Sequence, residues 1–68
     1  MSLHVTVNGT ALELADGATV AVLVAEHGGG HDRVAVARNG DVVPRSSWPA
    51  TPLDPGDVVE VLAPTAGG

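Results

Sequence analysis

Two Asn-Gly pairs divide this sequence, at Asn8-Gly9 and Asn39-Gly40, and each predicts a tight turn between two antiparallel strands. Apolar residues alternate with polar ones on both sides of the first pair, at Leu3, Val5, Val7, Leu12 and Leu14. An alternation of period two is typical of a strand that buries one face. The sequence therefore predicts an antiparallel hairpin over residues 3–14 and a second hairpin around Asn39-Gly40.

A helix is predicted between the two hairpins. Thr19 is a suitable N-cap, because its hydroxyl can accept a hydrogen bond from an N–H of the first turn. Helical spacing then relates Val20, Leu23, Val24 and His27. The β-branched residues of this segment lower its helix propensity. Gly28-Gly29-Gly30 is nevertheless a stop signal, and we expect the helix to end at Gly28.

The second half of the chain predicts short strands and one irregular connection. Residues 34–37 and Val42-Val43 should form the second hairpin, which Pro44 ends because proline cannot donate to a strand ladder. Residues 45–53 should be irregular, with one helical turn at Ser46–Trp48. A tight turn at 54–57 then leads into a last strand over residues 58–62.

These elements predict an α+β roll in which a mixed sheet of four to five strands packs on one main helix. A chain of 68 residues supports a single domain, which we place at residues 1–63, followed by a flexible tail at 64–68. The sequence has one aromatic residue, Trp48, so the core must be built from Val, Leu and Ala. Trp48 is expected to cover the open end of that core.

Charge restricts the partners that this chain can bind. The formal net charge is -5, and the cations are three arginines, with no lysine. A negative chain repels nucleic-acid phosphates and anionic membranes, so neither is expected as a partner. Cysteine is absent, which excludes thiolate chemistry and disulfides, and no apolar run reaches the length of a membrane span. The composition fits a cytoplasmic protein.

The side chains form no recognisable catalytic or metal motif. His27 and His31 are separated by glycines in a predicted loop, whereas a zinc pair needs both histidines on one helical face. Asp54 and Asp57 share one turn, where carboxylates usually accept local backbone hydrogen bonds. Arg45 could anchor a carboxylate of this chain or of a partner. We therefore expect no catalytic residue and no metal site in this chain.

The pair Gly67-Gly68 closes the sequence after a stretch without hydrophobic periodicity. A glycine carboxylate has no side chain to obstruct an incoming group, and two glycines fit a narrow channel. Such a carboxylate is ionised at neutral pH and is a poor electrophile until an ATP-consuming partner activates it.

The chain resembles the ubiquitin-like sulfur carriers of the β-grasp fold, and most closely the ThiS-type carriers of thiamin biosynthesis. The segments that carry the resemblance are Val7-Asn8-Gly9, Gly17-Ala18-Thr19-Val20 with Leu23, Ala37-Arg38-Asn39-Gly40, Val42-Val43-Pro44-Arg45 with Trp48, Asp54-Pro55-Gly56-Asp57, Val58-Val59-Glu60-Val61 and Ala66-Gly67-Gly68. They cover almost the whole chain.

This resemblance implies that the chain is a carrier and not an enzyme. Its Gly68 carboxylate would be adenylated by an E1-like adenylyltransferase (ThiF-like) that uses ATP and Mg, with no cofactor held permanently by the carrier. The resulting thiocarboxylate, on a tail that includes Ala66 and Gly67, would pass sulfur to a thiazole synthase (ThiG-like). Two alternatives stay open: a carrier for molybdopterin or cysteine synthesis, and a β-grasp interaction module that is never activated.

The last predicted strand also suggests where partners bind. Alternation places Val58, Glu60 and Leu62 on one face, and the face with Glu60 should point outward. Val58 and Leu62 would then be exposed apolar residues beside the tail, which is typical of a protein-binding surface. We predict partner binding at Val58, Glu60, Leu62 and Arg45.

Overall fold

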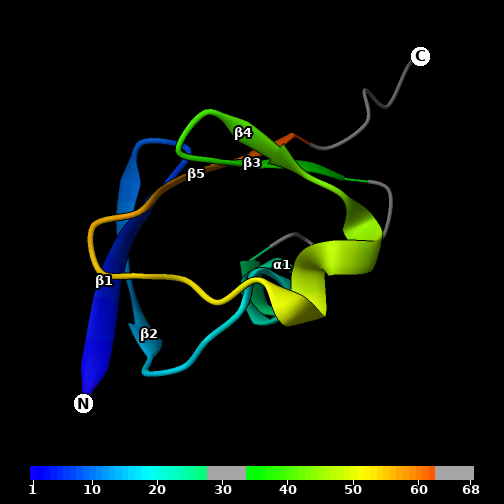
Figure 1. Cartoon of the computed structure of the whole chain (residues 1–68). Coiled ribbons are helices and arrows are strands. Elements are labelled where there is room, and N and C mark those ends of the chain that lie inside the picture. Colours follow the sequence, from blue (N-terminus) through cyan, green and yellow to red (C-terminus); the bar gives the residue numbers. More distant parts are fainter. Residues whose placement is uncertain (28–33, 63–68) are drawn as a thin grey trace.

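A computed structural model of the chain describes residues 1–27 and 34–62. The elements, in chain order, are β1 (Ser2–Val7), β2 (Thr10–Ala15), α1 (Val20–His27), β3 (Ala35–Arg38), β4 (Asp41–Val43), the 3₁₀ helix η1 (Arg45–Ala50) and β5 (Val58–Leu62). Across the described residues, five strands form one sheet in the order β2-β1-β5-β3-β4. Strands β1 and β5 are parallel and the other neighbours antiparallel. The sheet curves around α1, which confirms the predicted α+β roll (Figure 1).

Both predicted hairpins are present, and their turns have the expected backbone. Asn8 and Gly9 have φ of 50° and 81°, and Asn39 and Gly40 have φ of 52° and 88°. A two-residue turn with both central residues in the left-handed region matches the twist of the strands that it joins, and asparagine and glycine tolerate that region best. The first hairpin pairs β1 with β2 over their full length.

The predicted helix is α1. The Thr19 hydroxyl accepts a hydrogen bond from the Val22 N–H at 3.3 Å, as expected of an N-cap. Val20, Leu23 and Val24 are buried against the sheet, whereas His27 is exposed at the last helical residue. Burial of this apolar side therefore outweighs the low helix propensity of the valines. The predicted stop at residues 28–30 lies outside the described residues.

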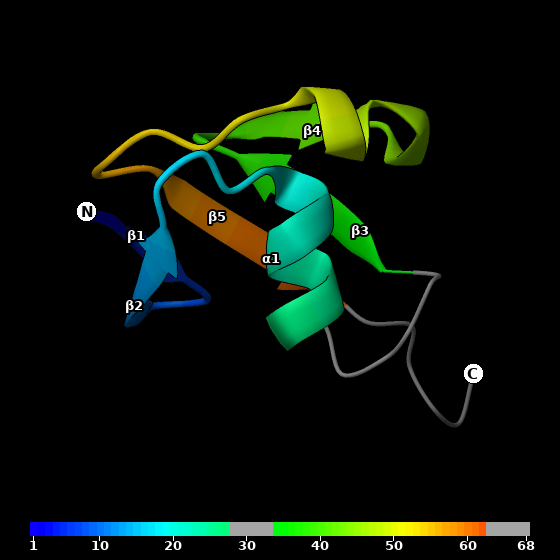
Figure 2. The ribbon, with the colours of Figure 1, turned by 90° about the horizontal axis from the view of Figure 1, so that it is seen from below.

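The core lies between α1 and the concave face of the sheet (Figure 2). It consists of aliphatic side chains and one tryptophan: Leu3, Val5, Val7, Leu14, Ala18, Val20, Leu23, Val24, Val34, Val36, Trp48, Leu53 and Val59. Trp48 is 8% exposed, and its indole Nε1–H donates a hydrogen bond to the Val43 carbonyl oxygen at 3.0 Å. Its predicted place as a cover of the core is confirmed.

Two predicted boundaries need correction. The connection after Pro44 is more regular than predicted, because η1 spans Arg45–Ala50 where a single turn at Ser46–Trp48 was expected. The Ser47 N–H donates to the Pro44 carbonyl at 2.8 Å, and burial of Trp48 holds the segment against α1. The strand expected from residue 34 begins at Ala35, since Val34 is buried in the core without joining the ladder.

The predicted boundary between residues 1–63 and a tail at 64–68 falls in a part of the chain that the structure does not describe. Among the described helices, none is both long and apolar enough to cross a membrane.

Candidate functional site

Strand β5 is the element on which the predicted site depends. It lies in the middle of the sheet, between β1 and β3, and it is the last described element before residues 63–68 (Figure 2). Its residues alternate as predicted: Val59 is fully buried, whereas Val58 and Leu62 are 50% and 63% exposed. Glu60 lies between them and is also exposed, which confirms that its face points outward.

The register of the strands extends this outer face beyond β5. Ala35 lies opposite Leu62, Ala37 lies opposite Glu60, and Val42 on β4 lies opposite Ala37. Residues opposite one another share a face of the sheet. Val42 is 77% exposed and thus belongs to the same surface as Val58 and Leu62.

We name the three exposed residues Val42, Val58 and Leu62 the outer patch. On this face, the β3 residues between Val42 and the exposed side chains of β5 are alanines, whose side chains are small. An exposed group of apolar side chains around one carboxylate is suited to bind another protein. Val42 was not among the predicted site residues, although its position next to the Asn39-Gly40 turn fixes its face once the hairpin register is known.

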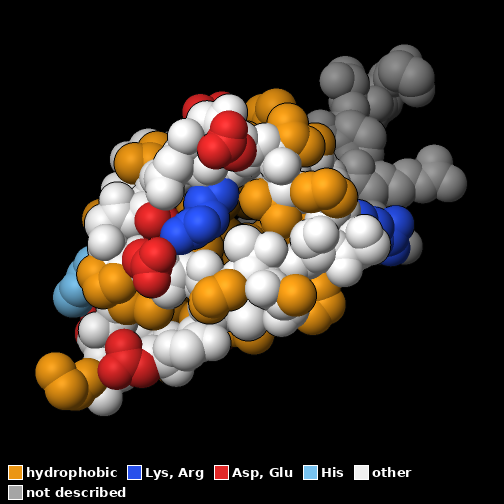
Figure 3. Space-filling model, in the orientation of Figure 1, with side chains coloured by type: hydrophobic (Ala, Val, Ile, Leu, Met, Phe, Trp, Pro, Cys, Tyr) orange, Lys and Arg blue, Asp and Glu red, His pale blue; other side chains and the backbone are white. Residues whose placement is uncertain are grey.

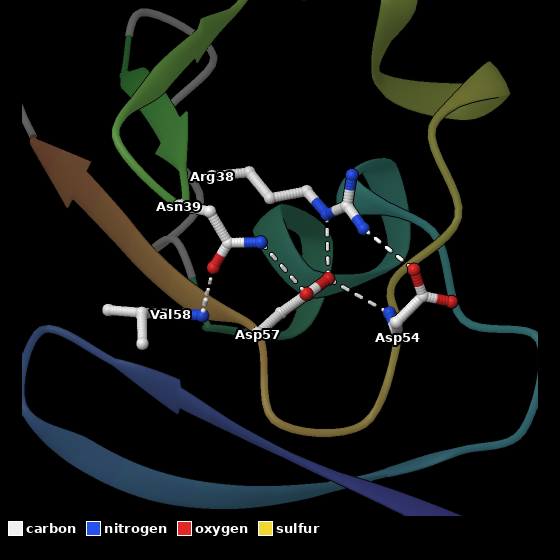
Figure 4. A network of polar contacts seen from close by, with 5 residues as sticks. All are labelled: Arg38, Asn39, Asp54, Asp57 and Val58. Carbon is white, nitrogen blue, oxygen red and sulfur yellow. Dashed lines mark hydrogen bonds and ion pairs between the residues drawn. The ribbon is translucent and has the colours of Figure 1, made fainter.

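Polar residues gather where β5 begins. In the view of Figure 3, basic and acidic side chains meet near the middle of one face, with hydrophobic side chains around them. Figure 4 shows the contacts: Arg38 Nε donates to Asp57 Oδ2 at 2.6 Å, and an Arg38 terminal nitrogen donates to Asp54 Oδ2 at 2.9 Å. Asn39 Nδ2 donates to Asp57 Oδ1 at 3.0 Å. The end of β3 is thereby tied to the turn that precedes β5.

Asp57 is the centre of this network. It is 6% exposed, and its Oδ2 also accepts the Asp54 backbone N–H at 2.9 Å, which closes the turn. Burial raises the pKa of Asp57, but the hydrogen bonds from Asp54, Arg38 and Asn39 and the charge of Arg38 outweigh burial and bring this pKa below its ordinary value. Asp57 is thus ionised at neutral pH and acts as a structural anchor. The predicted hydrogen bond within the turn is present for Asp57, whereas the Asp54 carboxylate pairs with Arg38 instead. The links to Arg38 and Asn39 were not foreseen.

The lowered pKa of Asp57 predicts acid sensitivity. Because this pKa is lower in the folded than in the unfolded protein, the stabilisation is complete above the unfolded value of about 3.9 and is lost as the pH falls through the folded value. We expect the free energy of unfolding to fall as the pH is lowered below about 5, and to fall less steeply in Asp57→Asn. Urea unfolding at several pH values measures both slopes. Equal slopes would contradict the assignment.

The other predicted site residues lie in three places. Val58, Glu60 and Leu62 are together on β5, whereas Arg45 is exposed at the first residue of η1. Ala66, Gly67 and Gly68 lie outside the described residues. Over residues 1–27 and 34–62, no three histidine or carboxylate side chains gather as metal ligands would.

The chain is similar to a known protein family and to two solved structures. The model of the ThiS family matches residues 5–68. A crystal structure of a thiamine biosynthesis protein (ThiS) from Geobacter metallireducens has a TM-score of 0.80 and 32% sequence identity, covering 97% of this chain and 100% of that chain. A solution structure of a thiamine biosynthesis protein from the same organism has a TM-score of 0.74 and 33% identity, covering 97% and 88% of the two chains.

A thiazole synthase from Paramagnetospirillum magneticum is 33% identical over 66 residues, which are 97% of this chain and 20% of that protein. The chain therefore spans about a fifth of the length of this curated relative. The similarity of fold to the ThiS structures identifies the roll as a β-grasp fold.

Proposed function

This chain belongs to the ThiS family, and from that premise we propose that it is a sulfur carrier whose Gly68 carboxylate becomes a thiocarboxylate for thiazole formation. The observation that carries the proposal is the extent of the family match, which runs from residue 5 through Gly67-Gly68 to residue 68. A similar fold and similar length in a ThiS structure support the same role.

The proposed chemistry has two steps. The Gly68 carboxylate attacks the α-phosphorus of ATP, so that an acyl adenylate forms and pyrophosphate leaves. Hydrosulfide then attacks the acyl carbon, expels AMP and leaves the thiocarboxylate. A protein persulfide can attack in its place, which expels AMP and forms an acyl disulfide; a thiol then cleaves its S–S bond to give the thiocarboxylate and a disulfide. The first step is needed because a carboxylate resists nucleophilic attack, whereas AMP is a good leaving group.

We assign both steps to a partner enzyme. The polar side chains at the start of β5 bond to one another. Asp57 accepts hydrogen bonds from Arg38, Asn39 and the Asp54 N–H, and Arg38 also pairs with Asp54. These contacts within the fold support the assignment of ATP binding to the partner. The proposed partners are an E1-like adenylyltransferase, which uses ATP and Mg, and a thiazole synthase. The similarity to a much longer thiazole synthase supports the second partner.

The outer patch is the proposed docking surface for these partners. Val58 and Leu62 lie on the strand that leads to residue 68, so a partner bound there is close to the start of the tail. The carboxylate of Glu60 between them favours a partner that presents a basic side chain among apolar ones. Arg45 is proposed to contribute at η1.

The docking assignment predicts that Leu62→Asp weakens binding of both partners about tenfold or more, because a charge would be buried without a counter-ion. The fold should persist, since Leu62 is 63% exposed. Val22→Asp is the control, because Val22 is also an exposed branched apolar residue but lies on α1, away from the outer patch. Calorimetric titration measures both variants. Unimpaired binding of Leu62→Asp would refute the assignment.

The proposed function is tested with the adenylyltransferase of the E1-like class from the same genome. The full chain is incubated with this enzyme, ATP, Mg and sulfide, and intact mass spectrometry follows the carrier. We expect a species heavier by the difference between one sulfur and one oxygen atom, located at Gly68 by fragmentation. Adding the thiazole synthase and its substrates should return the original mass. If no heavier species forms, the carrier function is wrong.

A further inference from the structure

The side chain of Asn8 makes two hydrogen bonds to β5, close to the end of that strand. The Val61 N–H donates to Asn8 Oδ1 at 2.9 Å, and Asn8 Nδ2 donates to the Val61 carbonyl oxygen at 3.0 Å. The Asn8 backbone N–H also donates to the Val59 carbonyl oxygen at 3.0 Å. A turn residue thus contacts a strand that lies more than fifty positions away in the chain.

Val61 is the residue of β5 that needs such a partner. On the β3 side, hydrogen-bonded pairs alternate with pairs that are not hydrogen-bonded. The Asn39 N–H donates to the Val58 carbonyl oxygen, so Val61, opposite Val36, falls in a pair that is not hydrogen-bonded. Its N–H and carbonyl therefore point toward β1. The β1 ladder, however, ends with Val7 opposite Val59, and the Asn8 carboxamide takes the place of the missing strand residue.

The contact with Val61 explains why residue 8 is an asparagine better than the turn does. Aspartate and glycine also suit the first position of such a turn. A carboxamide is different, because it offers a donor and an acceptor together, as a backbone peptide does. Asn39 makes part of this pattern at the other end of β5, where its Oδ1 accepts the Val58 N–H at 2.9 Å while its Nδ2 donates to Asp57. The two turn asparagines thus hold the two ends of the strand.

We propose that Asn8 is a positioning residue for activation of the carrier, which rests on the proposed function. Only Leu62 separates Val61 from residues 63–68. A segment of six residues reaches at most about 20 Å. Leu62 also lies opposite Ala35 on β3, so Asn8 fixes the side of this strand end that faces β1. By fixing Val61, Asn8 sets the point from which the Gly68 carboxylate is presented to a partner already bound at the outer patch.

The contact itself is tested by amide hydrogen exchange in Asn8→Gly and Asn8→Asp, both of which preserve the turn. We expect exchange at Val61 to accelerate about tenfold in Asn8→Gly, which loses both hydrogen bonds. The acceleration should be smaller in Asn8→Asp, which keeps the acceptor. Exchange at the core residue Val5 should stay unchanged. Unchanged exchange at Val61 in Asn8→Gly would overturn the proposal.

The positioning role is tested by steady-state kinetics of adenylation with the full chain as substrate. For Asn8→Gly we expect kcat to fall about three- to tenfold, with KM within twofold of the wild type. The outer patch that binds the partner is unchanged in this variant, whereas the position of the Gly68 carboxylate is less well fixed. Leu62→Asp should show the reverse, a raised KM. A purely structural role of Asn8 predicts wild-type kcat for the folded variant, and that result would overturn the inference. If the wild-type chain itself is not adenylated, the proposed function has failed instead.

Discussion

Asp57→Ala is expected to lower the free energy of unfolding by about 3 kcal/mol, because the substitution leaves Arg38, the Asn39 amide and the Asp54 N–H without their shared acceptor. For a domain of this size, that loss corresponds to a melting temperature lower by about 12–24 °C. A chain of 68 residues has a total stability of roughly 3–10 kcal/mol, so a large part of it depends on one carboxylate.

Asp54→Ala is the matched control for this prediction. The Asp54 side chain also pairs with Arg38, at 2.9 Å, but it is 73% exposed whereas that of Asp57 is 7% exposed. An exposed ion pair contributes at most about 1 kcal/mol because water and salt screen it. Thermal and urea unfolding, followed by circular dichroism, measure both variants. Equal losses for the two aspartates would show that burial of Asp57 is not what makes it important.

The parts of the fold that were predicted correctly depend on local signals. Asn8-Gly9 and Asn39-Gly40 each specify a turn through the backbone conformation of two adjacent residues, and Thr19 caps a helix that starts at the next residue. Alternation over residues 58–62 determined which side chains face outward without any knowledge of the neighbouring strands. Information of this kind lies within a few residues of where it acts, so it can be read from one sequence.

The parts that were missed depend on contacts between distant segments. Arg38 and Asp57 are 19 positions apart, and nothing near either residue shows that the two lie side by side. The same holds for Asn8 and Val61, whose contact requires the parallel register of β1 and β5. Val42 joined the outer patch only when the register of three strands was known. The full extent of η1 was missed, beyond the predicted turn at Ser46–Trp48, because burial of Trp48 and not helix propensity stabilises it.

Removal of Gly68, or addition of one alanine after it, is expected to abolish activation, with a loss of at least about a hundredfold in kcat/KM for adenylation. Removal shortens the reach of the carboxylate by about 3.5 Å, and a displacement of about 1 Å in a reacting group can already cost a hundredfold in rate. The added alanine converts the Gly68 carboxylate into an amide, which cannot attack ATP, and places a methyl group beside the new carboxylate.

Neither change touches a residue of the hydrophobic core or of the Asp57 network, so the melting temperature and the circular dichroism spectrum should equal those of the wild type. Binding to the adenylyltransferase through the outer patch should also persist, and each variant should therefore inhibit activation of the wild-type chain in competition. This combination separates a lost reacting group from a lost docking surface, for which no inhibition is expected. Pyrophosphate release measures adenylation directly. Wild-type rates for the chain with the added alanine would show that Gly68 is not the site of activation.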